Sequence, residues 1–332
     1  MKYVYVLVSG AKDYYYEQAL MSVTTLRMHM PSAEVIVLVD DVTEKSFQEP
    51  KRQALKQLAT IQAVPFAKDV PKVDRSRLLK TAIPTYVQGS FLFIDCDTII
   101  CDDLSEIENF PAETAGVLDG HVPLEAHVHR DMFLARDKKL GFHGTEKPDG
   151  NINSGVLLAK EGEASRTLFR IWNEQWKYSA YQKHEKHDQS ALYEANYLTG
   201  LQMALLPGQW NCQPEHGGLA YLEDAKIIHY YSSEMKGKYF TPYYKLADPV
   251  LQERIKQAGE IPDDIMEMLK KPKFQFNPVH LVSDKRIISI MQSPLLFTFA
   301  EMKMKHVHLF HFFENQVRFA RKMGKLLLGR KN

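Results

Sequence analysis

Cysteine is scarce in this sequence of 332 residues, which contains only Cys96, Cys101 and Cys212. Three cysteines do not make a network of disulfide bonds, and their spacing lacks the paired pattern of a zinc site. The composition therefore argues against a disulfide-stabilised secreted protein and favours a reducing, cytoplasmic environment.

Long apolar segments are missing as well, and no run of residues approaches the length that a membrane span requires. The strand-like residues 2–8 are too short for the apolar part of a signal peptide that is followed by a cleavage site. We therefore expect a protein that is neither secreted nor transmembrane.

The sequence carries little net charge, +1 in total, which argues against a general nucleic-acid-binding protein. The charge is nevertheless unevenly distributed. Eight basic residues and one acid between residues 303 and 332 give this tail about +7 and leave about −6 for the remainder. The basic residues of the tail are Lys303, Lys305, Arg318, Arg321, Lys322, Lys325, Arg330 and Lys331.

The sequence does contain enough apolar material, 45% of its residues, to bury a sizeable core in one large domain or two smaller ones. The predicted strands are residues 3–8, 34–39 and 60–64, a strand that begins at residue 91, and residues 115–118, 155–159 and 225–229. The predicted helices end near residues 30 and 58 and cover residues 75–86, 165–176 and 188–196. This alternation predicts an α/β fold with a mostly parallel, doubly wound sheet.

Two acids, Asp95 and Asp97, interrupt the apolar segment of residues 91–100. An apolar run that stops at acids predicts a strand buried on both faces that delivers carboxylates to its C-terminal edge, where open α/β sheets bind ligands. Carboxylate oxygens suit Mg²⁺ or Mn²⁺, and such an ion neutralises a diphosphate while leaving positions open for substrate. The segment thus predicts a metal-assisted enzyme acting on a phosphorylated ligand, although acids at a strand end also commonly cap a turn or a helix.

Residues 119–150 are polar and poorly periodic, which predicts a lid or substrate-binding loop. The histidines of this segment are possible metal ligands, but histidines in such segments are more often surface residues. They are His121, His127, His129 and His143.

Several short motifs, taken in order, resemble the nucleotide-sugar-dependent glycosyltransferases of the GT-A fold. The nearest resemblance is to glycosyltransferase family 8, with its lipopolysaccharide galactosyl- and glucosyltransferases and its glycogenin-like members. The motifs are the N-terminal strand with its polar turn, Arg77-Leu78-Leu79-Lys80, Phe93-Ile94-Asp95-Cys96-Asp97-Thr98, Asn151-Ile152-Asn153-Ser154-Gly155-Val156, Asp188-Gln189, Trp210-Asn211 and Ile228-His229. The resemblance implies a GT-A catalytic domain over residues 1–245, followed by a helical region over residues 246–332.

The resemblance further implies a hexosyltransferase that uses a UDP-sugar donor and a glycan or glycolipid acceptor. Asp95 and Asp97 match the D-x-D motif that chelates Mn²⁺ (or Mg²⁺) between the donor phosphates, and His229 matches the histidine that completes the protein ligands. The implied nucleotide- and donor-binding residues are Val8, Ser9, Asp40, Arg77, Lys80, Asp95, Cys96, Asp97, Asp119 and Lys236. The implied catalytic residues are Asp188, Gln189 and Asn153.

One part of the pattern departs from family 8, whose members commonly follow the metal histidine with a glycine and then a lysine that reaches the phosphates. Here His229 is followed by Tyr230-Tyr231-Ser232-Ser233-Glu234-Met235. Lys236 or Lys238 is the candidate for the phosphate lysine, shifted along the chain.

The resemblance also implies transfer with retention at the anomeric carbon. Retention follows from double displacement through a side-chain nucleophile, or from front-face attack in which the leaving phosphate takes the acceptor proton. The nearest candidates for a nucleophile are Gln189 and Asp188. Because an amide is a poor nucleophile, we favour the front-face route, with Asp188 holding the sugar.

The basic tail mixes its charges with bulky apolar side chains over residues 297–328. This pattern is typical of an amphipathic helix that lies on an anionic bilayer. It predicts a peripheral protein on the inner face of the cell membrane that modifies a lipid-linked glycan. The alternative is a helix that packs on the catalytic domain or on another subunit.

Two other functions compete with glycosyl transfer. Asp95-Cys96-Asp97-Thr98 also fits the D-x-D-x-T motif of haloacid dehalogenase-like Mg²⁺-dependent phosphatases. That motif normally ends the first strand of its domain, whereas here about 90 residues precede it. A non-enzymatic, lectin-like or scaffold role is the third possibility, and it predicts that UDP does not bind in the presence of Mn²⁺.

Overall fold

The computed structural model describes residues 1–127, 129–146, 150–214, 217–231, 244–276 and 294–328. They belong to two compact units, Met1–Phe276 and Asn277–Asn332. The first unit thus extends beyond residue 245 and includes two further helices, while the functional boundary at residue 245 stays a prediction.

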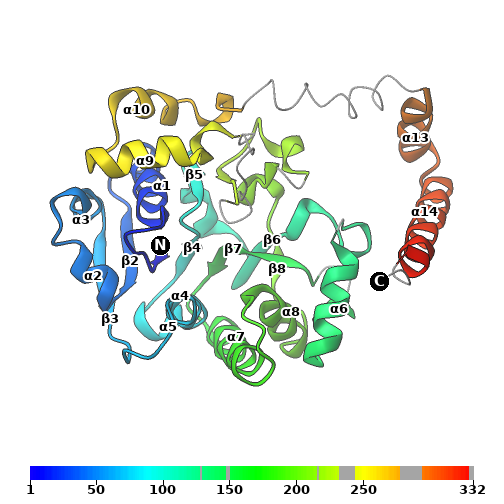
Figure 1. Cartoon of the computed structure of the whole chain (residues 1–332), viewed down its shortest axis with the longest axis horizontal. Coiled ribbons are helices and arrows are strands. Elements are labelled where there is room, and N and C mark those ends of the chain that lie inside the picture. Colours follow the sequence, from blue (N-terminus) through cyan, green and yellow to red (C-terminus); the bar gives the residue numbers. More distant parts are fainter. Residues whose placement is uncertain (128, 147–149, 215–216, 232–243, 277–293, 329–332) are drawn as a thin grey trace. The chain divides into compact units, whose positions relative to one another are not determined.

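The first unit is built on a seven-stranded mixed sheet with the strand order β3-β2-β1-β4-β7-β6-β8 (Figure 1). Its strands are β1 (Lys2–Leu7), β2 (Glu34–Asp40), β3 (Thr60–Val64), β4 (Phe91–Ile94), β6 (Thr114–Leu118), β7 (Ile152–Ala159) and β8 (Ala204–Leu205). Strands β3, β2, β1 and β4 are parallel neighbours, β7 runs antiparallel to both β4 and β6, and β8 is parallel to β6. The predicted α/β class with a mostly parallel mixed sheet is confirmed.

A second, two-stranded sheet pairs β5 (Thr98–Ile100) with β9 (Ile227–His229) in antiparallel register. The apolar segment that begins at Phe91 is therefore divided between two sheets. The division occurs at Asp95-Cys96-Asp97, where the backbone N–H of Asp95 donates to the carbonyl of Gly155 at 2.7 Å and the Thr98 hydroxyl donates to the Asp95 carbonyl at 2.8 Å. This turn directs the two acids out of the sheet.

Helices cover both faces of the larger sheet. In the first unit they are α1 (Tyr15–His29), α2 (Asp41–Ser46), α3 (Ala54–Leu58), α4 (Lys72–Thr81), α5 (Ile83–Tyr86), α6 (Arg130–Leu140), α7 (Glu163–Gln182), α8 (Asp188–Leu198), α9 (Pro249–Ala258) and α10 (Asp263–Leu269). Figure 1 shows α1, α9 and α10 on one side of the sheet and α4, α5, α7 and α8 on the other. Each side has its own buried core, in which large residues such as Tyr16 on α1 and Trp172 and Trp176 on α7 contact apolar strand residues.

Three predicted segments differ from the structure. The helix expected over residues 75–86 is divided at Ala82 into α4 and α5, and Pro84 lies in the first turn of α5. The helix expected to run to residue 58 is divided into α2 and α3, because Pro50 opens a short 3₁₀ turn between them and proline lacks the N–H that a continuous helix requires. The polar segment of residues 119–150 is not a loop throughout, since α6 forms within it. The helix buries Phe133, Asp137 and Leu140, and the acid in this stripe hides the helical period in the sequence.

The second unit contains α13 (Pro294–Lys305) and α14 (Val307–Leu328), which confirms the expected helical C-terminal region. The two helices contact each other through Phe299, whose ring packs edge-on against those of Phe310 and Phe313. In the part of the chain that the structure describes, no helix is both long and apolar enough to cross a membrane.

Candidate active site

A cavity of about 660 Å³ lies at the carboxyl ends of β1 and β4. The chain order reverses between these two strands, because β2 and β3 extend the sheet on one side of β1 and β4 lies on the other. In open α/β sheets, ligands bind at this topological switch point, where two diverging loops leave a crevice. The fold therefore places the cavity where the sequence predicts the chemistry.

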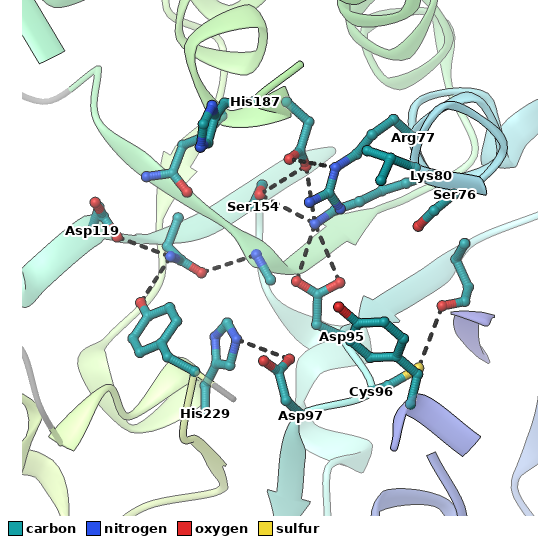
Figure 2. A pocket seen from close by; sticks show the side chains of 18 of the residues that line it. Ser76, Arg77, Lys80, Asp95, Cys96, Asp97, Asp119, Ser154, His187 and His229 are labelled. Carbon is teal, nitrogen blue, oxygen red and sulfur yellow. Dashed lines mark hydrogen bonds and ion pairs between the residues drawn. The ribbon is translucent and has the colours of Figure 1, made fainter. Parts of the chain in front are cut away.

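Most of the predicted site residues line this cavity although they come from distant parts of the chain (Figure 2). They are Val8, Arg77, Lys80, Asp95, Cys96, Asp97, Asp119, Asn153, Asp188, Gln189 and His229. Helix α4 supplies Arg77 and Lys80, β7 supplies Asn153, and α8 supplies Asp188 and Gln189.

Two predicted nucleotide-binding residues, Ser9 and Asp40, are not part of the described cavity wall. Both are buried and engaged in local structure. The Asp40 carboxylate accepts the Thr43 N–H at 2.9 Å as the N-cap of α2 and forms an ion pair with Arg75 at 2.9 Å. The Ser9 hydroxyl donates to Asp13 at 2.9 Å. Their predicted contacts with ribose and uracil stay predictions.

The predicted phosphate lysines, Lys236 and Lys238, lie outside the described residues. The structure does place other cations on the cavity wall, namely Lys72, Arg77, Lys80 and Arg136.

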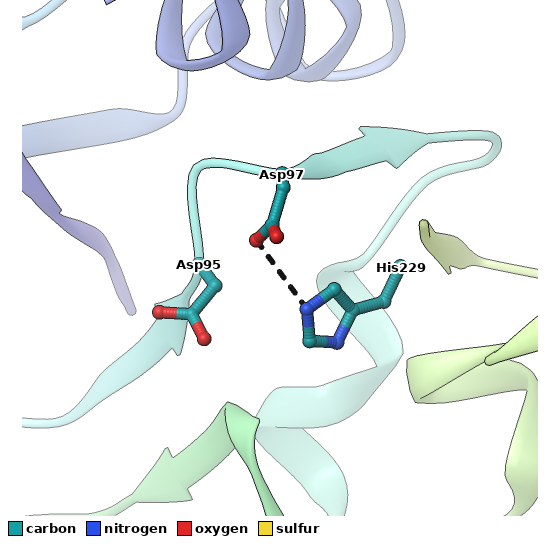
Figure 3. Close-up of side chains that lie close together, drawn as sticks. All are labelled: Asp95, Asp97 and His229. Atoms are coloured by element: carbon teal, nitrogen blue, oxygen red, sulfur yellow. Dashed lines mark ion pairs between the residues drawn. The ribbon is translucent and has the colours of Figure 1, made fainter. Parts of the chain in front are cut away.

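Asp95, Asp97 and His229 come together at one end of the cavity (Figure 3). One potential ligand atom from each lies within 4.8 Å of the others, and the Nε2 atom of His229 is 3.4 Å from an oxygen of Asp97. Two carboxylates and an imidazole form a donor set for a divalent cation such as Mn²⁺. The three residues that the sequence groups by resemblance therefore fit a metal ion in space.

The ionisation of Asp95 also fits a cation at this place. Burial raises the pKa of Asp95, and the neighbouring Asp97 carboxylate raises it further, whereas Lys80 opposes the rise. A divalent ion between the carboxylates would favour their ionised forms.

His229 is held in position by a polar chain and by a glycine. Its Nδ1 atom is 3.1 Å from Oδ1 of Asn211, whose Nδ2 donates to Oδ1 of Asn153 at 2.9 Å. The ring lies directly against Gly155, where an added Cβ would be 2.2 Å from Cε1 of His229. Only glycine leaves space for the imidazole at this point on β7 without a shift of the ring.

The other end of the site is an ionic network around Lys80. The buried Lys80 ammonium donates to both oxygens of Asp95, at 3.0 and 3.2 Å, and to the Ser154 hydroxyl at 3.2 Å. It also forms an ion pair with Asp188 at 3.2 Å, and Arg77 forms a second ion pair with Asp188 at 3.1 Å. Lys80 thus links the metal end of the cavity with Asp188.

Arg77 and Lys80 determine the ionisation state of Asp188. Burial alone would raise its pKa, but Arg77 and Lys80 outweigh burial and hold the pKa of Asp188 well below its usual range. Asp188 is therefore a carboxylate at neutral pH, and a weakly basic one.

A third cluster lies around Asp119. One of its oxygens accepts the Asn153 Nδ2–H at 2.9 Å, and the other is 3.4 Å from Nε2 of the buried His127.

Of the four histidines considered from the sequence, His127 and His129 line the cavity. His121 instead accepts the Gln213 N–H, and His143 is exposed near Glu194. Among the described residues, none of the four belongs to a group that could hold a metal ion.

Several wall residues were given no role by the sequence. Ser154 lies inside a motif that carries the resemblance, and Tyr231 follows His229 by two residues. Asn211, which is buried behind His229 and not on the wall, also lies inside such a motif. Their position within or beside a motif was the only feature of the sequence that pointed to them. Met132, Phe133 and Arg136 come from α6 and gave no signal, because that segment lacked a recognisable helical period.

Comparison with known proteins gives distant structural likenesses only. No protein-family model and no curated protein sequence matches the chain. The apo form of mouse xyloside xylosyltransferase 1 is 13% identical, with a TM-score of 0.45 over 71% of this chain and 99% of that one. The galactosyltransferase LgtC, solved with donor and acceptor sugar analogs, is 15% identical, with a TM-score of 0.47 over 80% of this chain and 99% of that one.

The glycosyltransferase GlyE of Streptococcus pneumoniae TIGR4 is 17% identical, with a TM-score of 0.47 over 83% of this chain and 66% of that one. The structure thus resembles solved glycosyltransferases.

Proposed function

We propose that this protein is a metal-dependent glycosyltransferase that transfers a hexose from a UDP-sugar to a hydroxyl group of a glycan or glycolipid, with retention at the anomeric carbon. One observation carries the proposal. Asp95, Asp97 and His229 meet on the wall of a cavity at the switch point of the sheet, beside Asp188 and Asn153. These are the residues whose order along the chain resembles glycosyltransferase family 8.

The metal end of the cavity suits the donor diphosphate. Asp95, Asp97 and His229 would hold Mn²⁺ or Mg²⁺, which when bound neutralises charge on the two phosphates and on the departing UDP. Lys80 keeps the Asp95 carboxylate in place, because its ammonium donates hydrogen bonds to both carboxylate oxygens. Val8, at the end of β1, lies where the nucleoside would enter the crevice.

Asp188 favours the front-face route to retention. A carboxylate paired with Arg77 and Lys80, whose pKa is held low, is a weak nucleophile because its electron density is already shared with two cations. Such a carboxylate still accepts hydrogen bonds from sugar hydroxyls and stabilises positive charge that develops on the sugar ring. We assign Asp188 to holding the donor sugar.

Gln189 lies on the same wall, one residue into α8. Its side-chain amide is hydrogen-bonded to the hydroxyl of Tyr193 at 2.5 Å, which anchors the side chain on the wall. Because an amide is a poor nucleophile, we assign Gln189 to positioning the donor sugar. In this route the leaving phosphate would take the proton of the acceptor.

The test is turnover and binding with Asp97→Ala and Asp95→Ala variants. Wild-type protein should release UDP from one UDP-hexose in the presence of Mn²⁺ and be stabilised by that donor in a thermal-shift panel of UDP-, GDP- and CDP-sugars. Both variants should lose Mn²⁺-dependent turnover by at least about 100-fold. Asp69→Ala, which removes an exposed acid outside the cavity, is the control. Full activity of either site variant would remove the metal from the proposal.

The phosphatase alternative is not favoured by the strand order. The D-x-D-x-T motif follows β4, the fourth strand along the chain, whereas in the phosphatases it normally ends the first strand. Hydrolysis of an aryl phosphate with Mg²⁺, without need for a sugar nucleotide, would reinstate that alternative.

We further propose that the second unit binds an anionic membrane surface, which would place the enzyme at the inner face of the cell membrane beside lipid-linked acceptors. Most of the described apolar side chains on α14 are exposed although they are bulky. Those exposed by at least 39% are Val307, Leu309, Phe312, Phe313, Val317, Phe319 and Met323. Exposed aromatic residues next to basic ones suit the boundary between headgroups and acyl chains.

A further inference from the structure

The buried amides of Asn153 and Asn211 form a directed hydrogen-bond chain that ends on His229. Asn211 is fully buried and Asn153 nearly so. The amide orientation in such a chain follows from its neighbours, because a backbone N–H only donates and a carboxylate only accepts. Both kinds of neighbour are present here, so the direction of every link can be assigned.

The chain starts at two unambiguous partners of Asn153. The backbone N–H of Gly155 donates to one atom of the Asn153 amide at 2.9 Å, so that atom is the oxygen. The Asp119 carboxylate accepts from the other atom at 2.9 Å, so that atom is the nitrogen. The Asn153 oxygen also contacts the Asn211 amide at 2.9 Å, and Asn211 must therefore present its nitrogen there.

The orientation of Asn211 then fixes the tautomer of His229. With its nitrogen committed to Asn153, Asn211 presents its oxygen to His229 at 3.1 Å. An oxygen acceptor requires the proton on Nδ1 of the imidazole. In the neutral imidazole the opposite nitrogen, Nε2, then carries the lone pair, and this is the atom that lies 3.4 Å from Asp97.

We propose that Asn211 is a positioning residue that keeps Nε2 of His229 free of a proton and aimed at the divalent ion, with Asn153 setting the direction of Asn211. This inference rests on the proposed metal-dependent function. A metal ligand needs an unprotonated nitrogen, and outer partners that fix the tautomer of a ligating histidine raise metal affinity by about 10- to 100-fold.

The same geometry assigns Asn153 to this chain. Its oxygen accepts from Gly155 and Asn211, and its nitrogen donates to Asp119 and to the Tyr231 hydroxyl at 2.9 Å. All four hydrogen-bonding positions of the amide are thereby occupied. Asn153 thus acts through Asn211 on the metal ligand and is a positioning residue, rather than the catalytic residue that the resemblance implies.

The first measurement needs no metal. Imidazole ¹⁵N resonances of the whole protein, recorded at about pH 8 where an ordinary histidine is neutral, report which ring nitrogen carries the proton. The His229 signal is assigned by its loss in His229→Gln. Wild-type protein should show Nδ1 protonated, and Asn211→Leu should show a mixture of tautomers. A wild-type His229 with the proton on Nε2 would overturn the inference.

The second measurement is Mn²⁺ affinity without donor, followed by electron paramagnetic resonance. Asn211→Leu should bind Mn²⁺ at least about tenfold more weakly than wild type. The matched control is Asn196→Leu, which removes another buried amide whose oxygen accepts the Met203 N–H, away from the cavity, and which should keep wild-type affinity. An equal loss of Mn²⁺ affinity in both variants, or no loss of affinity in Asn211→Leu, would overturn the inference.

Asn211→Asp keeps the experiment decisive if the leucine variant does not fold. The carboxylate retains an acceptor for Nδ1, although it lacks the N–H that Asn211 donates to Asn153, so this variant should keep the Nδ1–H tautomer in the ¹⁵N measurement. Loss of that tautomer would contradict the positioning role. A wild-type protein that binds no Mn²⁺ would overturn the proposed function itself, and is thus distinguished from the failure of Asn211 alone.

Discussion

At the scale of the residue, the site depends on close contacts that leave no spare space. Gly155 is the clearest case. Its backbone is not in the left-handed region, so the position does not need glycine for its conformation. It needs glycine because His229 Cε1 occupies the space that a side chain would fill. The absence of a side chain at Gly155 on β7 thus leaves the space that the His229 imidazole occupies.

Gly155→Ala should therefore act on the metal site through one methyl group. The new Cβ would lie 2.2 Å from the ring of His229, so the imidazole must shift, and Mn²⁺ affinity should fall by at least about tenfold. Overpacking of this kind costs about 1–3 kcal/mol of the free energy of unfolding. Metal titration and chemical denaturation measure the two effects.

Gly10→Ala is the matched control for this substitution. A Cβ at Gly10 would have its nearest neighbour, an oxygen of Asp13, at 3.6 Å, which is an ordinary contact. This variant should keep wild-type Mn²⁺ affinity. If the Gly155→Ala variant bound Mn²⁺ as tightly as wild type does, the close contact with His229 would have no consequence for the metal site.

At the scale of the element, α6 buries an acid on its apolar side, near Glu194 of α8. Asp137 lies in the buried stripe of α6, and one of its oxygens accepts the Thr145 N–H at 3.1 Å. Burial raises the pKa of Asp137 to about 6, and Glu194 on α8 adds to the rise. A carboxyl whose pKa is raised on folding destabilises the protein while it is ionised, at pH values above the folded pKa.

Asp137→Asn should consequently stabilise the protein at neutral pH. The penalty for ionised Asp137 is up to about 3 kcal/mol above pH 6 and disappears as the pH falls from about 6 to about 4, where folded and unfolded wild type are both protonated. Denaturation curves at several pH values should show the advantage of the variant shrinking over that window. Asp131→Asn, at an exposed position on α6, is the control. An advantage that did not change with pH would contradict the assignment.

At the scale of the whole molecule, the uneven charge of the sequence belongs to one structural unit. The basic tail falls in the unit Asn277–Asn332, and the exposed aromatic residues of α14 lie in the same helix as Arg318 and Arg321. Each basic residue near an anionic surface contributes about 1 kcal/mol to membrane binding. Charge and exposed apolar area therefore act together.

The double variant Arg318→Glu with Arg321→Glu should test this attraction without removing any apolar side chain. Binding to vesicles that contain phosphatidylserine should weaken by at least about tenfold, as measured by sedimentation, while binding to neutral vesicles stays unchanged. Reversal of two exposed lysines of the first unit, Lys45→Glu with Lys68→Glu, changes the net charge equally and is the control. If both double variants lost vesicle binding equally, the net charge of the protein, and not the basic tail, would account for the attraction to the membrane.

The sequence was sufficient for the parts of the protein that depend on local pattern. The buried strand β4 and the acids after it were predictable because an apolar run that stops at charged residues favours a strand buried on both faces with the charges at its end. The strand order of an α/β sheet then required those acids to lie at its carboxyl edge. The metal residues Asp95, Asp97 and His229 followed from their resemblance to a family, and the structure brings them together.

What only the tertiary structure decided is which of these groups touch one another. Asp188 is 93 residues from Asp95 in the chain, yet Lys80 contacts both, and Arg77 and Lys80 together keep Asp188 ionised. The direction of the amide chain that ends on His229 likewise depends on Gly155 and Asp119, which meet only in the folded state. The physical reason is that side-chain ionisation and hydrogen-bond polarity depend on neighbours within a few ångströms, and sequence patterns do not determine those distances.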